Sequence, residues 1–194
     1  MNKIIHPGAG ILFMKVGTHA RETLEDIIAR KVKEIEDAGF ALWGYGGNTC
    51  HPQTMVQPFA RSFEKRGEMI YLCMHEMPSK HFAQPVRADQ YSEDGISWKD
   101  VPPAINVLGS RYALVITDLR KEEIELPLSM TRVAIGNCQG RAGDRYISGR
   151  VDKACLEVTE MPVETAQSSN TNIHINLVAE VHQPYAVYVR NTPV

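Results

Sequence analysis

The sequence lacks the features of membrane-spanning and secreted proteins. No run approaches the roughly 18 consecutive apolar residues of a transmembrane helix, and the first apolar patch ends at Pro7, which argues against a signal peptide. The four cysteines are scattered and show no C-x-x-C spacing. This spacing favours free thiols in a reducing compartment over a disulfide framework. We therefore expect a cytoplasmic protein that has no membrane partner.

Several signatures of known chemistry are also missing. The net charge of -2 gives no overall attraction to polyanions. The glycines match neither the Walker nor the dinucleotide fingerprint, and there is no H-E-x-x-H metal motif. No stretch alternates aromatic and basic residues as an RNA-binding sheet would. The sequence predicts no cofactor, and binding of an anion would have to come from a local patch.

What is present is the composition of an ordinary globular domain. The 194 residues are 43% hydrophobic and 23% charged, which suits one α+β domain over residues 1–194. Residues 10–16 and 40–45 read as strands. Between them, residues 20–38 carry apolar side chains at helical spacing, with Thr18 as the expected N-cap and Gly39 as the stop. The chain therefore opens with a β-α-β unit.

The remainder predicts a mostly antiparallel sheet. Pro58 should not be tolerated inside a continuous helix, so we expect a short helix over residues 58–66. Strands should follow at residues 68–75, 131–135 and 151–158. Two hairpins are expected, one joining 112–118 to 122–128 and the other joining 173–181 to 185–190.

A long irregular stretch interrupts this pattern at about residues 77–110. It contains four prolines and few periodic apolar residues. Long loops inside compact domains are usually functional or mobile. We interpret this stretch as a lid, an oligomer arm or an insertion.

The densest set of reactive side chains follows the second strand, in a glycine turn before Pro52. If Pro52 opens a helix, its free N–H groups and dipole suit a phosphate or carboxylate. The histidine could carry a proton, and the thiol could have a lowered pKa. The simpler alternative is a tight turn without a ligand. The candidate residues are Gly46, Gly47, Asn48, Thr49, Cys50 and His51.

A second candidate is rich in arginine and glycine. Between Arg132 and Lys153 there are five basic and two acidic residues, and arginine forks bind phosphates well. The alternative is a solvated loop whose arginines pair with nearby carboxylates. The predicted ligand-binding residues are Arg141, Arg145, Arg150 and Lys153.

A metal site is the weakest of the alternatives. Cys73 and His75 should point the same way on a strand, and Cys50 with His51 could add ligands. Because no metal motif is present, we predict no metal.

Three functions remain open. The leading hypothesis is an anionic ligand, either a nucleotide or a nucleic-acid phosphate backbone, bound where the glycine turn and the arginine segment converge. The second is a hydrolase or transferase that uses Cys50 and His51. The third is an interaction protein, in which the proline-containing loop and the last hairpin bind a protein partner or form a homo-oligomer.

Overall fold

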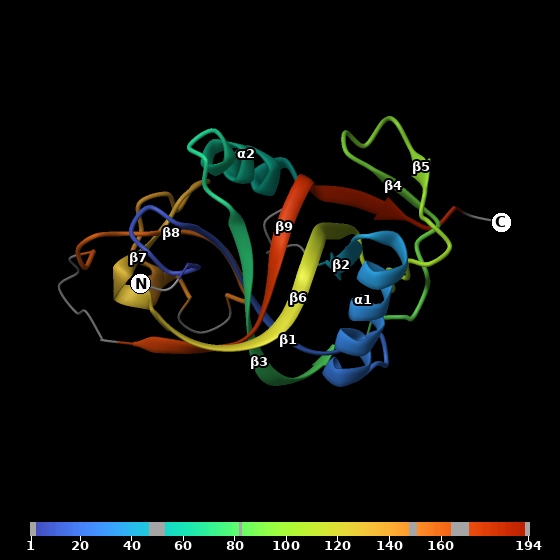
Figure 1. Cartoon of the computed structure of the whole chain (residues 1–194), viewed down its shortest axis with the longest axis horizontal. Coiled ribbons are helices and arrows are strands. Elements are labelled where there is room, and N and C mark those ends of the chain that lie inside the picture. The colour runs from blue at the N-terminus through green and yellow to red at the C-terminus, as the bar shows by residue number, and fades with distance from the viewer. Residues whose placement is uncertain (1–2, 47–52, 82, 148–150, 164–170, 193–194) are drawn as a thin grey trace. The chain divides into compact units, whose positions relative to one another are not determined.

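A computed structural model describes residues 3–46, 53–81, 83–147, 151–163 and 171–192. Within them the chain forms a mixed α and β fold that opens with a β-α-β unit, as predicted (Figure 1). The helices are α1 (Leu24–Ala38), α2 (Gln53–Glu64), the 3₁₀ turn η1 (Leu128–Met130) and α3 (Gly143–Tyr146). The strands are β1 (Gly10–His19), β2 (Ala41–Tyr45), β3 (Ile70–His81), β4 (Gln90–Ser92), β5 (Lys99–Asp100), β6 (Tyr112–Pro127), β7 (Thr131–Val133), β8 (Lys153–Val158) and β9 (Asn172–Arg190).

All of these strands belong to one sheet. The main path runs β2-β6-β9-β3-β1-β8-β7, while β4 pairs with β9 and β5 pairs with β4. The pairs β1–β8, β2–β6, β4–β5, β4–β9 and β7–β8 are antiparallel. The predicted α+β class with a mostly antiparallel sheet is therefore confirmed. In the strand order β1 and β2 are separated by three other strands.

Helix α1 begins later than its sequence pattern suggested. Residues 17–19 continue β1, and the N-cap is Thr23, whose Oγ1 accepts a hydrogen bond from the Asp26 backbone N–H. The prediction of Thr18 was wrong because Thr18 and Thr23 both precede acidic residues, so the local sequence does not show which of them is the N-cap. The tertiary fold decides between them. The predicted stop is confirmed, since Gly39 has a φ of 82° and donates its N–H to the Ile35 carbonyl.

Helix α2 contradicts the expectation that Pro58 would exclude a continuous helix. Pro58 lies inside α2 and faces solvent. The helix buries Val56, Phe59, Ala60 and Phe63. Proline removes one backbone hydrogen bond, but the carbonyl that loses its donor lies on the exposed side of the helix. Burial of the opposite apolar face outweighs that loss.

Both predicted hairpins are single strands. The expected turn after Asp118 is a local irregularity within the 16-residue strand β6, where Asp118 has a positive φ. The expected turn around Pro184 lies within the 19-residue strand β9, next to Tyr185, which also has a positive φ. The residues that suggested turns therefore mark local changes of backbone conformation within two long strands.

The chain divides into two compact units, each assembled from separate stretches. Unit 1 comprises Met1–Lys15, Thr49–Glu76 and Arg120–Val178, and unit 2 comprises Val16–Asn48, Met77–Leu119 and Ala179–Val194. The strands β1, β3, β6 and β9 each contribute residues to both units.

Each unit has its own apolar core. The core of unit 1 surrounds Phe13, Cys73, Leu126 and Leu156, which are at most 1% exposed. The core of unit 2 brings Leu42 and Val187 together with Ala88, Val101, Ile105 and Val107. The last four residues come from the stretch predicted to be an irregular loop. Much of that stretch is therefore packed into a core.

The Arg87 side chain forms hydrogen bonds that link several residues in the packed part of this stretch. Its Nη2 donates to the carbonyls of Pro102 and Ile105, and its Nε donates to Asn106 Oδ1. Leu108 pairs with Arg87 through an isolated β-bridge. Hydrogen bonds to the Arg87 guanidinium thus hold together the stretch between β3 and β6. A role as a lid is not needed to explain why this stretch is long.

Candidate functional site

The glycine turn that the sequence singled out lies mostly outside the described residues. Gly46, which follows β2, is described, whereas Gly47, Asn48, Thr49, Cys50 and His51 are not. The Arg111 backbone N–H donates to the Tyr45 carbonyl at the end of β2. A Cβ on Gly46 would lie 3.9 Å from the Arg111 nitrogen. The Arg111 backbone therefore lies beside the start of this turn, and sequence reasoning missed this neighbour.

The arginine and glycine segment is better defined. We call residues 136–145, which follow β7 in unit 1 and include the first three residues of α3, the Arg/Gly connection. Its ends are tied together because Gly140 donates to the Val133 carbonyl and Val133 donates to the Arg141 carbonyl, both at 2.8 Å. A β-bridge joins Arg132 to Ala142. The connection is thus a structured loop.

Two glycines permit this loop conformation. Gly136 and Gly140 have φ values of 90° and 85°, which side chains rarely adopt. A Cβ at Gly136 would come within 2.5 Å of Met55 Cε. Because Met55 lies in the first turns of α2, the Arg/Gly connection packs against the amino-terminal end of this helix. That end follows the glycine turn in the chain.

The arginines of this region differ in the contacts that their side chains make. Arg132 donates Nε and Nη2 to Glu157 Oε2 at 3.0 and 2.8 Å, and Arg66 donates Nη1 to Glu157 Oε1. Burial raises the pKa of Glu157, but these two arginines outweigh it and hold the pKa below its ordinary value. The charge of Arg132 is therefore paired with that of Glu157.

Arg141 and Arg145 are exposed on either side of the start of α3. Within the described part of the chain, the Arg141 guanidinium forms neither a hydrogen bond nor an ion pair. Asp144 is buried, and its Oδ1 accepts the Arg145 backbone N–H at 2.7 Å. Lys153 is half-buried at the start of β8, and Arg150 lies outside the described residues.

The described residues give little support to a metal or catalytic site built from cysteine and histidine. Among the described residues, no group of three or more histidine, cysteine, aspartate or glutamate side chains is arranged to hold a metal. Cys73 is fully buried, and burial raises the pKa of its thiol to about 12. His75 Nδ1 lies 2.6 Å from the His174 carbonyl oxygen. Cys50 and His51, the proposed catalytic pair, are not described.

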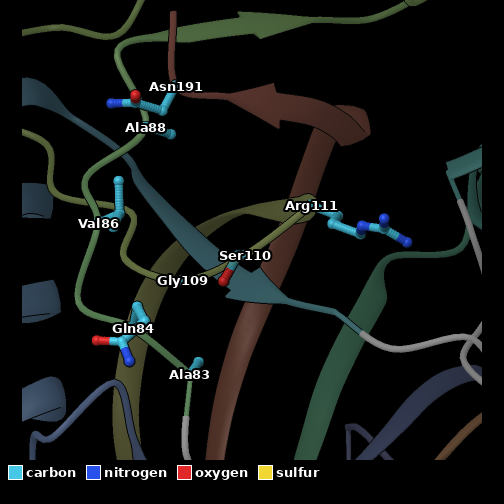
Figure 2. Close-up of a pocket in the computed structure, with 8 residues that line it drawn as sticks. All are labelled: Ala83, Gln84, Val86, Ala88, Gly109, Ser110, Arg111 and Asn191. Carbon is cyan, nitrogen blue, oxygen red and sulfur yellow. The ribbon is translucent and has the colours of Figure 1, made fainter. Parts of the chain in front are cut away.

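Unit 2 contains a pocket of about 350 Å³, which we call the unit 2 pocket. Figure 2 shows its lining on the segment before β4, on the segment that leads into β6 and on Asn191 after β9, with the Arg111 side chain directed away from the others. Small residues form much of the wall, and a Cβ at Gly109 would lie 2.7 Å from the Gln84 carbonyl oxygen. The lining residues are Ala83, Gln84, Val86, Ala88, Gly109, Ser110, Arg111 and Asn191.

The polar groups of the pocket are partly engaged. Gln84 Oε1 accepts from Arg21 Nη2 at 3.3 Å, and Asn191 Nδ2 donates to the Arg87 carbonyl at 2.9 Å. Ser110 Oγ donates to the Leu108 carbonyl. The remaining surface is mainly aliphatic, and Val86 is 52% exposed. The pocket therefore suits an apolar group.

Comparison with protein-family models, with curated proteins and with solved structures finds no match to this chain. No helix among the described residues is both long and apolar enough to cross a membrane.

Proposed function

We propose that this protein binds a phosphate-bearing anionic ligand at the Arg/Gly connection, beside the amino-terminal end of α2. The observation that carries the proposal is the contact between Gly136 and Met55. It brings an arginine-bearing loop next to a helix terminus, where backbone N–H groups lack partners within the helix. The leading sequence hypothesis placed the ligand where the arginine segment meets the glycine turn, most of which lies outside the described residues.

The charges of the region support the same ligand class. Arg141 is exposed and uncommitted, and Arg145 is exposed one helical turn further on. Two guanidinium groups four residues apart can reach one phosphate or two neighbouring phosphates. The rigid loop reduces the conformational entropy that binding would cost. Nucleotides and the phosphate backbone of a nucleic acid share this chemistry.

The cellular setting is part of the proposal. The cysteines Cys73, Cys138 and Cys155 are free thiols, which agrees with a reducing compartment such as the cytoplasm. A phosphate ligand of this compartment, either a free nucleotide or a nucleic acid, is the expected partner.

Isothermal titration calorimetry at low salt tests the proposal with three ligands: a nucleoside triphosphate, a short RNA and a short DNA. Arg141→Ala and Arg145→Ala should each weaken binding by about tenfold or more, as for a lost charged contact. Each change should also reduce the salt dependence by about one phosphate contact. The matched control is Arg61→Ala, which removes an equal charge from the last turn of α2.

The pattern of binding identifies the source of the phosphate. Binding of the triphosphate alone indicates a nucleotide site, whereas binding that strengthens with the length of RNA or DNA indicates a backbone site. Absence of heat with all three ligands at low salt rejects the proposal, and so does an equal loss in the Arg61→Ala control.

A further inference from the structure

Unit 2 exposes two large apolar side chains among its described residues. Ile96 is 83% exposed and Val86 is 52% exposed. Single exposed apolar residues are common and carry no meaning by themselves. These two differ because Val86 lines the unit 2 pocket and Ile96 occupies the tip of a structured hairpin turn.

The turn that carries Ile96 joins β4 to β5 and is fixed by Asp94. Asp94 Oδ1 accepts hydrogen bonds from the backbone N–H groups of Ile96 and Ser97, at 2.8 and 2.7 Å, and from Ser92 Oγ at 2.9 Å. Ser92 Oγ in turn accepts the Gly95 N–H. These hydrogen bonds hold the pKa of Asp94 well below its usual range. The exposed Ile96 side chain thus projects from a turn whose conformation is fixed by hydrogen bonds.

Aromatic contacts hold both the turn and the strands of the same hairpin. Gly95 has a φ of 77°, and a Cβ there would lie 3.3 Å from the Tyr188 ring. The Arg190 guanidinium lies 3.8 Å from the centre of the Trp98 ring, and its Nη2 donates to Gln90 Oε1. Figure 1 shows the hairpin standing clear of α1. A side chain presented in this way loses little conformational entropy when it is buried by a partner.

The unit 2 pocket has the size and chemistry to receive an aliphatic side chain. A cavity of about 150 Å³ lined by aliphatic groups already admits benzene, and this pocket measures about 350 Å³. Ala83, Val86 and Ala88 supply methyl groups, and Gly109 leaves the backbone bare. Burial of an isoleucine against such a wall is favourable by the hydrophobic effect.

The charges around the two features are complementary. The hairpin carries Glu93, Asp94 and Asp100 against the single cation Lys99. Arg111 lines the pocket and Arg21 donates to Gln84, which also lines it, and within the described part of the chain neither arginine forms an ion pair with a carboxylate. An acidic hairpin approaching this border would meet opposite charge.

We propose that this protein self-associates, with Ile96 of one copy seated in the unit 2 pocket of a second copy, against Val86 and Gly109. Reciprocal insertion produces a closed dimer, and one-way insertion produces a longer chain of copies. The interface is independent of the phosphate site, which lies in unit 1.

Sedimentation velocity of the full chain over a wide concentration range tests the proposal. We expect the wild-type weight-average mass to rise with concentration. Ile96→Asp and Val86→Asp should each raise the dissociation constant by at least about tenfold, because each would bury a carboxylate against an apolar wall. Met161→Asp is the control, because Met161 is also exposed but belongs to unit 1. Circular dichroism checks that each variant folds.

A mixture of two variants separates this contact from general stickiness. The Ile96→Asp chain keeps an intact pocket, and the Val86→Asp chain keeps an intact Ile96. An equimolar mixture should therefore form heterodimers with an affinity that neither variant shows alone. A wild-type mass that stays monomeric at every concentration overturns the proposal. Association that persists unchanged in Ile96→Asp overturns it equally.

Discussion

Lys31 and Glu34 meet inside unit 2, where Lys31 Nζ lies 2.8 Å from Glu34 Oε2 and both residues are only 2% exposed. Lys31 also donates to the Asn106 carbonyl, and the Asn106 N–H donates to Glu34 Oε1. Arg30 adds a hydrogen bond to Glu34. This buried pair therefore ties α1 to the stretch before β6.

Removing the carboxylate from this network should be costly. Glu34→Gln leaves Lys31 buried without its charge partner, and we expect a loss of about 3 kcal/mol in the free energy of unfolding. Urea denaturation measures the change. The matched control is Asp37→Asn, which breaks the exposed Lys33–Asp37 pair of the same helix and should cost less than about 1 kcal/mol. Equal effects of the two substitutions would contradict the assigned role of the buried pair.

The same lysine predicts an alkaline pH dependence. Burial lowers the pKa of Lys31 from 10.5 to about 8, despite the opposing attraction of Glu34. Between these values the unfolded chain binds more protons at this group than the folded chain does. The stability of wild type relative to Lys31→Met should therefore rise as the pH increases from about 8 to 10.5. Urea midpoints of both proteins over this range provide the test, and a constant difference would refute it.

Thiol labelling should divide the cysteines into two groups. Burial raises the pKa of the Cys73 thiol to about 12 and also raises that of Cys155, and both side chains are fully buried. Native alkylation followed by mass spectrometry should therefore modify Cys138 before either of them. The same experiment reports on Cys50. Labelling of Cys50 much faster than Cys138 would favour the hydrolase or transferase hypothesis, and slower labelling would count against it.

Gly143 should not tolerate a larger residue. A Cβ at this position would overlap Thr131 Oγ1, which donates to the Leu128 carbonyl at 2.8 Å. Gly143→Ala should lose about 1 to 3 kcal/mol of stability, as expected for overpacking. Combining it with Thr131→Ala should recover part of the loss. A double-mutant cycle by denaturant unfolding that shows strict additivity would exclude the steric explanation.

Local patterns predicted the elements whose causes are local. The apolar spacing of Leu24 and Ile27, with Gly39 behind them, was sufficient for α1. The hairpins failed because Asp118 and Tyr185 bend long strands without reversing them, and only pairing with distant strands decides between the two outcomes. Pro58 failed because the burial of Phe59 and Phe63 outweighs a local preference.

The residues of the candidate site likewise divide into those that the local sequence predicted and those that depend on contacts between distant segments. Arg141 and Arg145 were found because they are close in sequence and share a charged, glycine-rich segment. Arg111 was missed because its place next to Gly46 depends on the pairing of β2 with β6. The unit 2 pocket depends on the bridge between Arg87 and Leu108, and no periodicity in the sequence signals it. Met55 against Gly136 is another contact between distant segments.

The division of four strands between the two units bears on how the chain folds. Unit 1 includes residues as far apart as 1 and 178, and unit 2 needs its third stretch, from residue 179 onward. Any contiguous fragment that contains all three stretches of one unit also contains two stretches of the other unit. During synthesis, unit 2 becomes complete only after every segment of unit 1 has emerged from the ribosome. Such dependence on distant contacts is typical of slow folding, so the two units should mature late and close together in time.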